Sequence, residues 1–159
     1  MLKLGYSDSN ENSEFTTRLI QVIDEEREDI YLGIGDIELI PRYRGDYPGA
    51  GQHEFIDRAY EFTKRVERER IVFMTPLEFT EVLYDSQTIR RAVIICFSNG
   101  VPYAYSLRPM VEVKDVNKIQ HQLGQLEIRV LDGDLFYILS NDNGLIEILE
   151  KKMQEYVLK

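Results

Sequence analysis

Residues 92–98 read A-V-I-I-C-F-S and are followed by Asn99-Gly100 and then by V-P-Y-A-Y-S-L at 101–107. An Asn-Gly pair between two such runs is the strongest short-range signal for a β-hairpin, because both residues tolerate the positive φ angles of a two-residue turn. The first run is apolar at odd and even positions alike, which predicts a strand covered on both faces and central in its sheet. We therefore expect this hairpin at the centre of the fold.

The predicted hairpin also sets the partners of its two arms. A two-residue turn places Arg91 opposite Arg108 at the open end. Two like charges that face each other across a sheet are unfavourable. We expect an acid such as Asp85 or Glu112, or an anionic group of a partner, to lie between the two arginines, with Arg90 close by.

Further helices and strands are predicted on both sides of the hairpin. Helices are expected at about 13–26, 54–69, 76–84, 115–124 and 145–157, where apolar residues recur at helical spacing. Strands are expected at 29–34, 37–42, 71–74, 110–113, 126–131 and 135–140, with Gly35-Asp36 and Asp132-Gly133-Asp134 as turns. Because the strands come as hairpins between separated helices, we predict an α+β fold: a single domain over 1–159, with a largely antiparallel sheet and helices packed mainly on one face.

The composition suits a protein that folds without disulfides. Of the 159 residues, 43% are hydrophobic, and the single cysteine, Cys96, lies inside an apolar run. A lone cysteine favours the reducing cytoplasm. The chain has no apolar stretch near the roughly 20 residues that span a bilayer, and its start lacks a signal-peptide core, so we expect a soluble cytoplasmic protein. The expected core includes Leu19, Ile56, Phe62, Phe73, Ile94, Cys96, Ile128, Leu149 and Met153.

Negative charge is concentrated near the N-terminus. The chain has 19 Lys and Arg against 28 Asp and Glu, a formal net charge of −9, which opposes binding to the phosphate backbone of nucleic acids. The end of the first predicted helix offers a candidate face for a basic partner. This acidic face consists of Asp24, Glu25, Glu26 and Glu28. The alternative interpretation is a solvated helix end.

A second candidate site is the glycine-rich segment from Arg42 to His53, R-Y-R-G-D-Y-P-G-A-G-Q-H. Its glycines allow backbone amides to approach an anion, and it leads into a helix N-terminus with partial positive charge. Candidate contact residues are Arg42, Tyr43, Arg44, Tyr47 and His53, together with Arg90, Arg91 and Arg108. The segment matches neither a dinucleotide fingerprint nor a P-loop, so a plain surface loop is the alternative.

No motif in the chain completes a catalytic or metal-binding signature. His53-Glu54-Phe55-Ile56-Asp57 resembles the zinc-protease motif H-E-x-x-H, but Asp57 stands where the second histidine ligand is needed. A nucleophilic Cys96 with His53 or His121 as its base requires an exposed cysteine, whereas a mid-strand position predicts burial. We expect neither a metal nor a cofactor, and the lack of a catalytic signature favours a protein that is not an enzyme without excluding one.

The favoured interpretation is a protein-binding module that inhibits or neutralises another macromolecule, as immunity proteins, antitoxins and phage counter-defence proteins do. The expected partner is another protein, and the acidic face would suit a basic one. Neither nucleic acid nor membrane is expected as a partner. One alternative is a small-ligand protein or enzyme that acts on a phosphorylated or nucleotide compound through the Arg42 to His53 segment. Another is a subunit of a homo-oligomer.

Overall fold

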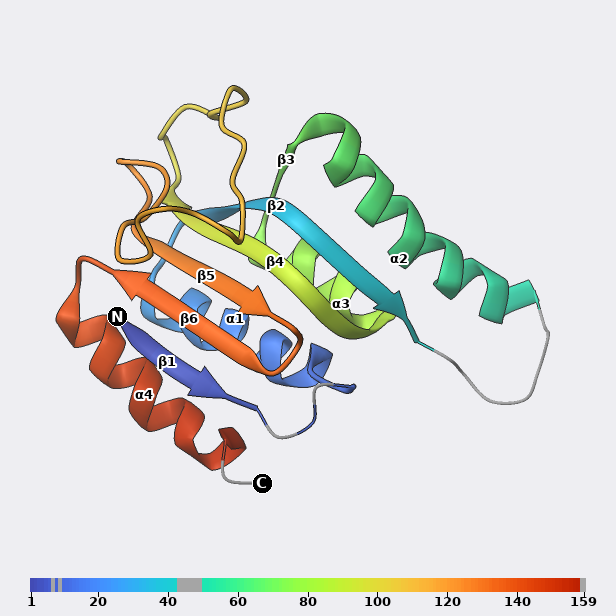
Figure 1. The fold of residues 1–159 in the computed structure, drawn as a ribbon, viewed down its shortest axis with the longest axis horizontal. Coiled ribbons are helices and arrows are strands. Elements are labelled where there is room, and N and C mark those ends of the chain that lie inside the picture. Colours follow the sequence, from blue (N-terminus) through green and yellow to red (C-terminus); the bar gives the residue numbers. More distant parts are fainter. Residues whose placement is uncertain (7, 9, 43–49, 158–159) are drawn as a thin grey trace.

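One antiparallel sheet runs through the fold (Figure 1). The computed structural model describes residues 1–6, 8, 10–42 and 50–157, with residues 50–57 as backbone only. The strands are β1 (Leu2–Gly5), β2 (Ile30–Pro41), β3 (Ile71–Met74), β4 (Ser86–Ser98), β5 (Leu126–Leu131) and β6 (Leu135–Ser140). The helices are α1 (Ser13–Glu26), α2 (Ala50–Glu69), α3 (Pro76–Tyr84) and α4 (Asn143–Val157). The strand order is β1-β6-β5-β4-β2-β3, which confirms the predicted α+β class.

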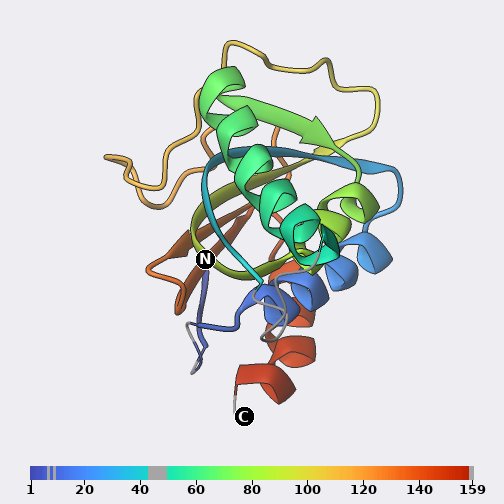
Figure 2. The same cartoon turned by 90° about the vertical axis from the view of Figure 1, so that its right-hand side faces the viewer.

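All the described helices contribute to a core on the same face of the sheet. Figure 2 shows α1, α3 and α4 gathered below β2, with the yellow connection after β4 running above it. The core joins residues of each helix to alternate residues of the strands. Seven expected core residues are buried: Leu19, Phe62, Ile94, Cys96, Ile128, Leu149 and Met153. Phe73 is only partly buried, and the side chain of Ile56 lies outside the described part.

The predicted central strand is confirmed. β4 lies between β2 and β5 and pairs with both. Ile94 and Cys96 point to the helices, whereas Ile95 and Phe97 point to a second apolar cluster on the other face. Each residue from 92 to 97 is at most 1% exposed. A run that is apolar at odd and even positions alike thus indicates a strand that is buried on both faces of the sheet.

Local capping and turn signals also form as expected. The Thr75 hydroxyl accepts a hydrogen bond from the Glu78 N–H (3.2 Å), and the Glu78 carboxylate accepts one from the Thr75 N–H (2.7 Å). This capping box starts α3, with Pro76 at its first position. Asp132 and Gly133 take positive φ angles and connect β5 to β6 as a hairpin.

The predicted turn at Gly35-Asp36 is wrong. β2 is one strand of 12 residues, and Asp36 takes a φ of 43° within it. The register of β2 against β4 shifts between Gly35 and Glu38, which identifies a β-bulge rather than a turn. The 13-residue β4 is long enough to pair with both halves of β2, so the chain bends and continues.

The predicted hairpin at Asn99-Gly100 is also wrong, although its turn forms. The Val101 N–H donates to the Ser98 carbonyl (3.2 Å), but the chain does not return along β4. Both edges of β4 are already occupied, because Cys96 lies between Leu32 of β2 and Leu126 of β5. Residues 99–125, the outer segment, contain neither helix nor strand. The predicted strand at 110–113 and helix at 115–124 are therefore wrong as well.

A buried polar network holds the outer segment on the sheet. Glu127 and Arg129 of β5 form an ion pair while only 0% and 3% exposed. The Gln120 backbone and side-chain N–H groups donate to Glu127 (2.6 and 2.8 Å). Arg129 donates to the carbonyls of Val116 (3.2 Å) and Lys118 (2.6 Å). These bonds fix the chain in a non-helical path across the outer face.

Candidate functional site

Most of the glycine-rich site lies outside the described residues. Three of its predicted contact residues fall there: Tyr43, Arg44 and Tyr47. His53 is described only as backbone within α2. Arg42 is described, and its N–H and guanidinium donate to the carbonyls of Asp85 and Ser86 (both 3.2 Å), so it is bound to the start of β4. Ligand binding by this segment stays a prediction.

Three arginines that are distant in sequence meet at the β2 bulge. Arg70 follows α2, Arg91 belongs to β4 and Arg108 to the outer segment, and together with Asp36 they line a pocket of about 230 Å³. We call this site the arginine pocket. The sequence indicated two of the arginines but not Arg70, which looks like an ordinary charged residue at a helix end. Its φ of 70° is the only unusual feature, and no sequence pattern shows it.

The charge in this pocket is only partly balanced. The Asp36 carboxylate forms an ion pair with Arg91, with Nε 3.2 Å from Oδ1, and accepts a hydrogen bond from the Val111 N–H (2.8 Å); its side chain is 11% exposed. Within the described ranges, the side chains of Arg70 and Arg108 form neither a hydrogen bond nor an ion pair. Asp36 is therefore the acid beside Arg91, in place of the predicted Asp85 or Glu112.

The arginines meet for a reason other than the predicted hairpin register. On β2 the partner of Arg91 is Glu38, and Arg108 belongs to no strand. Arg91 and Arg108 lie near each other because Pro109, which follows Arg108, packs against Gly35 of β2. The contact is so close that a Cβ atom added to Gly35 would lie 2.2 Å from Pro109 Cγ. A glycine is needed at this position for the outer segment to cross β2. Arg90 lies apart, 3.9 Å from Glu38, and does not line this pocket.

An exposed group of aromatic rings lies on the same face. Tyr103 stacks on Phe73 with ring centroids 4.5 Å apart, and Tyr105 meets Phe73 edge-on at 5.1 Å. Tyr103 and Tyr105 are nevertheless 51% and 66% exposed. We call Tyr31, Phe73, Tyr103 and Tyr105 the aromatic surface. Phe73, which the sequence placed in the core, thus links the interior to exposed tyrosines.

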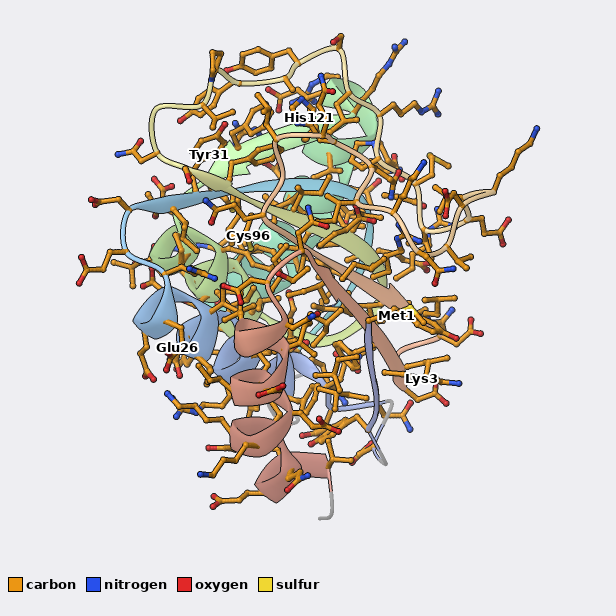
Figure 3. The ribbon with its side chains drawn as sticks, turned by 90° about the vertical axis from the view of Figure 1, so that its left-hand side faces the viewer. Met1, Lys3, Glu26, Tyr31, Cys96 and His121 are labelled. Carbon is orange, nitrogen blue, oxygen red and sulfur yellow. The ribbon has the colours of Figure 1, made fainter. Side chains whose placement is uncertain are left out.

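Tyr31 is the base of the aromatic surface. Its hydroxyl donates to the Val101 carbonyl (2.8 Å), and its ring stacks on Phe97 at 5.1 Å. Burial raises the pKa of Tyr31, and the neighbouring Tyr103 adds a smaller contribution in the same direction, so the Tyr31 hydroxyl remains a neutral donor. Figure 3 shows Tyr31 and His121 beside the outer segment, with α4 on the far side of the sheet.

The predicted acidic face divides into two pairs of residues. Glu25 and Glu26 bind Lys152 of α4 at 3.6 and 2.6 Å, and the hydrogen bond that Lys152 donates to Glu26 raises the pKa of Lys152. Asp24 and Glu28 are exposed and have no ion pair within the part of the chain that the structure describes. Within the acidic face, only Asp24 and Glu28 can bind a basic partner without first breaking an ion pair with Lys152.

Cys96 and His121 lie on opposite sides of the sheet. Cys96 is buried among the helices, and burial raises the pKa of its thiol to about 12. His121 packs against the Phe97 ring at 5.2 Å, and its Nδ1 accepts from the Leu123 N–H (3.1 Å). This histidine therefore cannot serve as the base for this thiol. The predicted burial of Cys96 is confirmed.

We expect Cys96 in the native protein to react with a bulky thiol reagent only when the chain unfolds. The reactive species is the thiolate, which burial disfavours. Folding raises the pKa of the Cys96 thiol from 9.0 to about 12, so the unfolded chain loses this proton at a lower pH than the folded protein does. The free energy of unfolding therefore decreases as the pH rises from about 9 to about 12. The measurement compares labelling rates with unfolding rates obtained by urea jump. Immediate labelling under native conditions would contradict the burial.

A wider groove of about 650 Å³ lies between α2 and α3, but its lining has no dominant charge. It is lined by basic residues such as Arg65 and Arg68 and by acidic residues such as Glu78 and Glu81. At one end, Asp85 binds Arg58 (3.3 Å). Charges of both signs in an open groove do not select a ligand class, so the site is built from the aromatic surface and the arginine pocket.

Neither metal chemistry nor similarity identifies the site. Among the described side chains, no group of at least three His, Cys, Asp or Glu residues is arranged to hold a metal ion. None of the described helices has the length and apolarity required to cross a membrane. Comparison with known proteins found no match among family models, curated proteins or solved structures. The geometry of the described residues is therefore the only guide to function.

Proposed function

We propose that this protein is a binding module that recognises another protein through the aromatic surface and thereby inhibits or neutralises it. The observation that carries the proposal is the pair Tyr103 and Tyr105, which are largely exposed while packed against Phe73. Tyrosine is enriched at protein interfaces because it offers a large contact area at a low cost in side-chain entropy. Rings that are already stacked lose still less freedom when a partner binds.

The support beneath these tyrosines favours a preformed interface. The outer segment has no regular secondary structure, yet Arg129 binds two of its carbonyls and Tyr31 binds a third, at Val101. Pro109, within the same segment, packs against Gly35. An irregular segment held at several points can present side chains in a definite arrangement, as binding loops on a rigid scaffold do.

Charged groups lie on both sides of the aromatic surface. The Asn99 N–H donates to the Asp29 carbonyl (2.6 Å), so the end of the acidic face adjoins the start of the outer segment. Gly35 lies four positions after Tyr31 in β2, roughly 13 Å away at the usual strand rise, and the arginine pocket begins beside it. This arrangement favours a partner with apolar side chains at the centre of its contact patch and basic ones facing Glu28.

The test is the double substitution Tyr103→Ala with Tyr105→Ala. The partner is first isolated with the parent protein from its native host, identified by mass spectrometry and purified. We expect the double variant to bind it at least 30-fold more weakly, from about 2 kcal/mol for an interface tyrosine, with a free energy of unfolding changed by less than about 1 kcal/mol. The parent, but not the variant, should reduce the partner's own activity.

The matched control is Tyr60→Ala on α2, which removes a tyrosine of similar exposure (58%) outside the aromatic surface. It should leave the affinity unchanged. Equal affinities for the parent and the double variant would remove the aromatic surface from the interface. A protein that captured only further copies of itself, with a mass that rises with concentration in light scattering, would instead indicate a homo-oligomer.

A further inference from the structure

We propose that the arginine pocket is a binding site for a doubly charged oxyanion, the phosphate group of a phosphorylated compound. The site is assigned from Arg70, Arg91, Arg108 and Asp36 and does not depend on the aromatic surface or on a protein partner. It also differs from the glycine-rich segment, in which the sequence suggested an anion site.

The charge of the pocket matches a dianion. Its lining includes three arginines and the carboxylate of Asp36, and 3 − 1 leaves a surplus of two positive charges. Glu67 also lines the pocket, but its carboxylate binds Lys64 (3.0 Å), and this lysine balances its charge. The whole chain carries −9, so this surplus runs against the protein's overall charge. A single carboxylate would neutralise half of the surplus, whereas a phosphate dianion neutralises all of it.

Enough hydrogen-bond donors remain to hold such a group. Each guanidinium has five N–H donors in a planar fork, which suits phosphate oxygens. Arg91 directs its Nε to Asp36, so its terminal nitrogens remain for a ligand. The side chains of Arg70 and Arg108 direct no donor to any described residue. Paired donors from more than one arginine give both strength and geometric selectivity toward oxyanions.

The backbones that carry the arginines are held in place. Arg70 follows the last residue of α2; its N–H donates to the Val66 carbonyl (2.7 Å), and its backbone takes the left-handed conformation. Arg91 lies in the central strand β4. Arg108 precedes Pro109, which is packed against Gly35. A ligand therefore has to order side chains only, which lowers the entropy cost of binding.

The size of the pocket indicates what part of a ligand it takes. Its volume of about 230 Å³ is below the range of roughly 300–1,000 Å³ found for sites that enclose a drug-sized molecule. A phosphate group fits such a site, while the remainder of a phosphorylated molecule would lie outside it. The exposed Met110 side chain at the rim offers apolar contact for that remainder.

The experiment titrates the protein with inorganic phosphate and, separately, with glycerol phosphate in chloride buffer of constant ionic strength. The arginine Nε–Hε signals are followed by NMR. We expect saturable shifts for Arg70, Arg91 and Arg108. Arg70→Gln and Arg108→Gln should each weaken binding by about tenfold, since each removes charge-assisted hydrogen bonds. Stronger binding of glycerol phosphate identifies an organic ester as the ligand, and equal binding identifies phosphate itself.

The matched control is Arg90→Gln, which makes the same change of charge at the neighbouring position of β4 but outside the pocket. Its affinity for phosphate should equal that of the parent. Equal losses in Arg90→Gln and Arg108→Gln would show nonspecific attraction and overturn the proposal. So would the absence of saturable shifts with both ligands in the folded parent protein. Circular dichroism of each variant establishes that it is folded.

Discussion

Glu127→Ala is expected to lower the free energy of unfolding by about 3–5 kcal/mol, because it leaves the Arg129 guanidinium buried without its counter-charge. Both side chains are almost completely buried. The substitution also removes the acceptor for two N–H groups of Gln120 (2.6 and 2.8 Å). Urea unfolding monitored by circular dichroism measures the loss. Glu147→Ala, on the exposed side of α4, is the control and should change stability by less than about 0.5 kcal/mol.

A local measurement separates this mechanism from general damage to the core. Residues 116–120 are held to β5 by the buried ion pair, so their amides should exchange hydrogen faster in Glu127→Ala than those of β4. The double variant Glu127→Leu with Arg129→Leu should cost less than the sum of the two single changes, since neither charge is left alone. A loss below about 1 kcal/mol for Glu127→Ala would show that water already reaches Arg129.

Asn12→Ala is expected to cost about 2–4 kcal/mol, because it leaves several buried backbone groups without partners. Asn12 is completely buried. Its Nδ2 donates to the carbonyls of Ile89 and Gly133 (both 2.7 Å), and its Oδ1 accepts from the Ile89 N–H (2.7 Å). The β4–β5 ladder begins at Ala92, so at Ile89 the asparagine side chain takes the place of a strand.

Two further variants test that explanation. Asn10→Ala changes an exposed asparagine two residues away and should have little effect on the urea midpoint. Asn12→Asp keeps an acceptor for the Ile89 N–H but directs a carboxylate at two carbonyl oxygens, so it should also destabilise the fold. A midpoint for Asn12→Ala close to that of the parent would mean that the β4 edge needs no such bridge.

Local patterns alone predicted much of the scaffold. The α1 helix at 13–26, the capped α3 helix and the β5–β6 hairpin all form where the sequence indicates them. The fully apolar run of β4 likewise predicted a central strand and a buried Cys96. These features are local because a cap, a turn or a helical stripe depends on residues only a few positions apart.

The outer segment and the arginine pocket were not predictable in this way. A run such as L-E-I-R-V-L normally indicates a strand with one solvated face, yet Glu127 and Arg129 are buried because the outer segment covers them. β1 is four residues long, too short for a periodic signal, and it forms by pairing with β6 at the far end of the chain. Asn12 has no distinctive sequence context either, and the Gly35-Asp36 pair indicated a turn rather than a bulge.

Local sequence patterns were thus sufficient to predict the fold class, the central strand and the helices on one face. The pairing of β4 with β5, rather than with residues 101–107, depends on contacts between distant segments, and it places Tyr103, Tyr105 and Arg108 on the outer face. The physical reason is competition for a strand edge. An Asn-Gly turn favours a hairpin locally, but each edge of a strand accepts only one partner. Which segment pairs there depends on how much apolar surface the distant segments bury together and on how many buried polar groups they provide with hydrogen-bond partners.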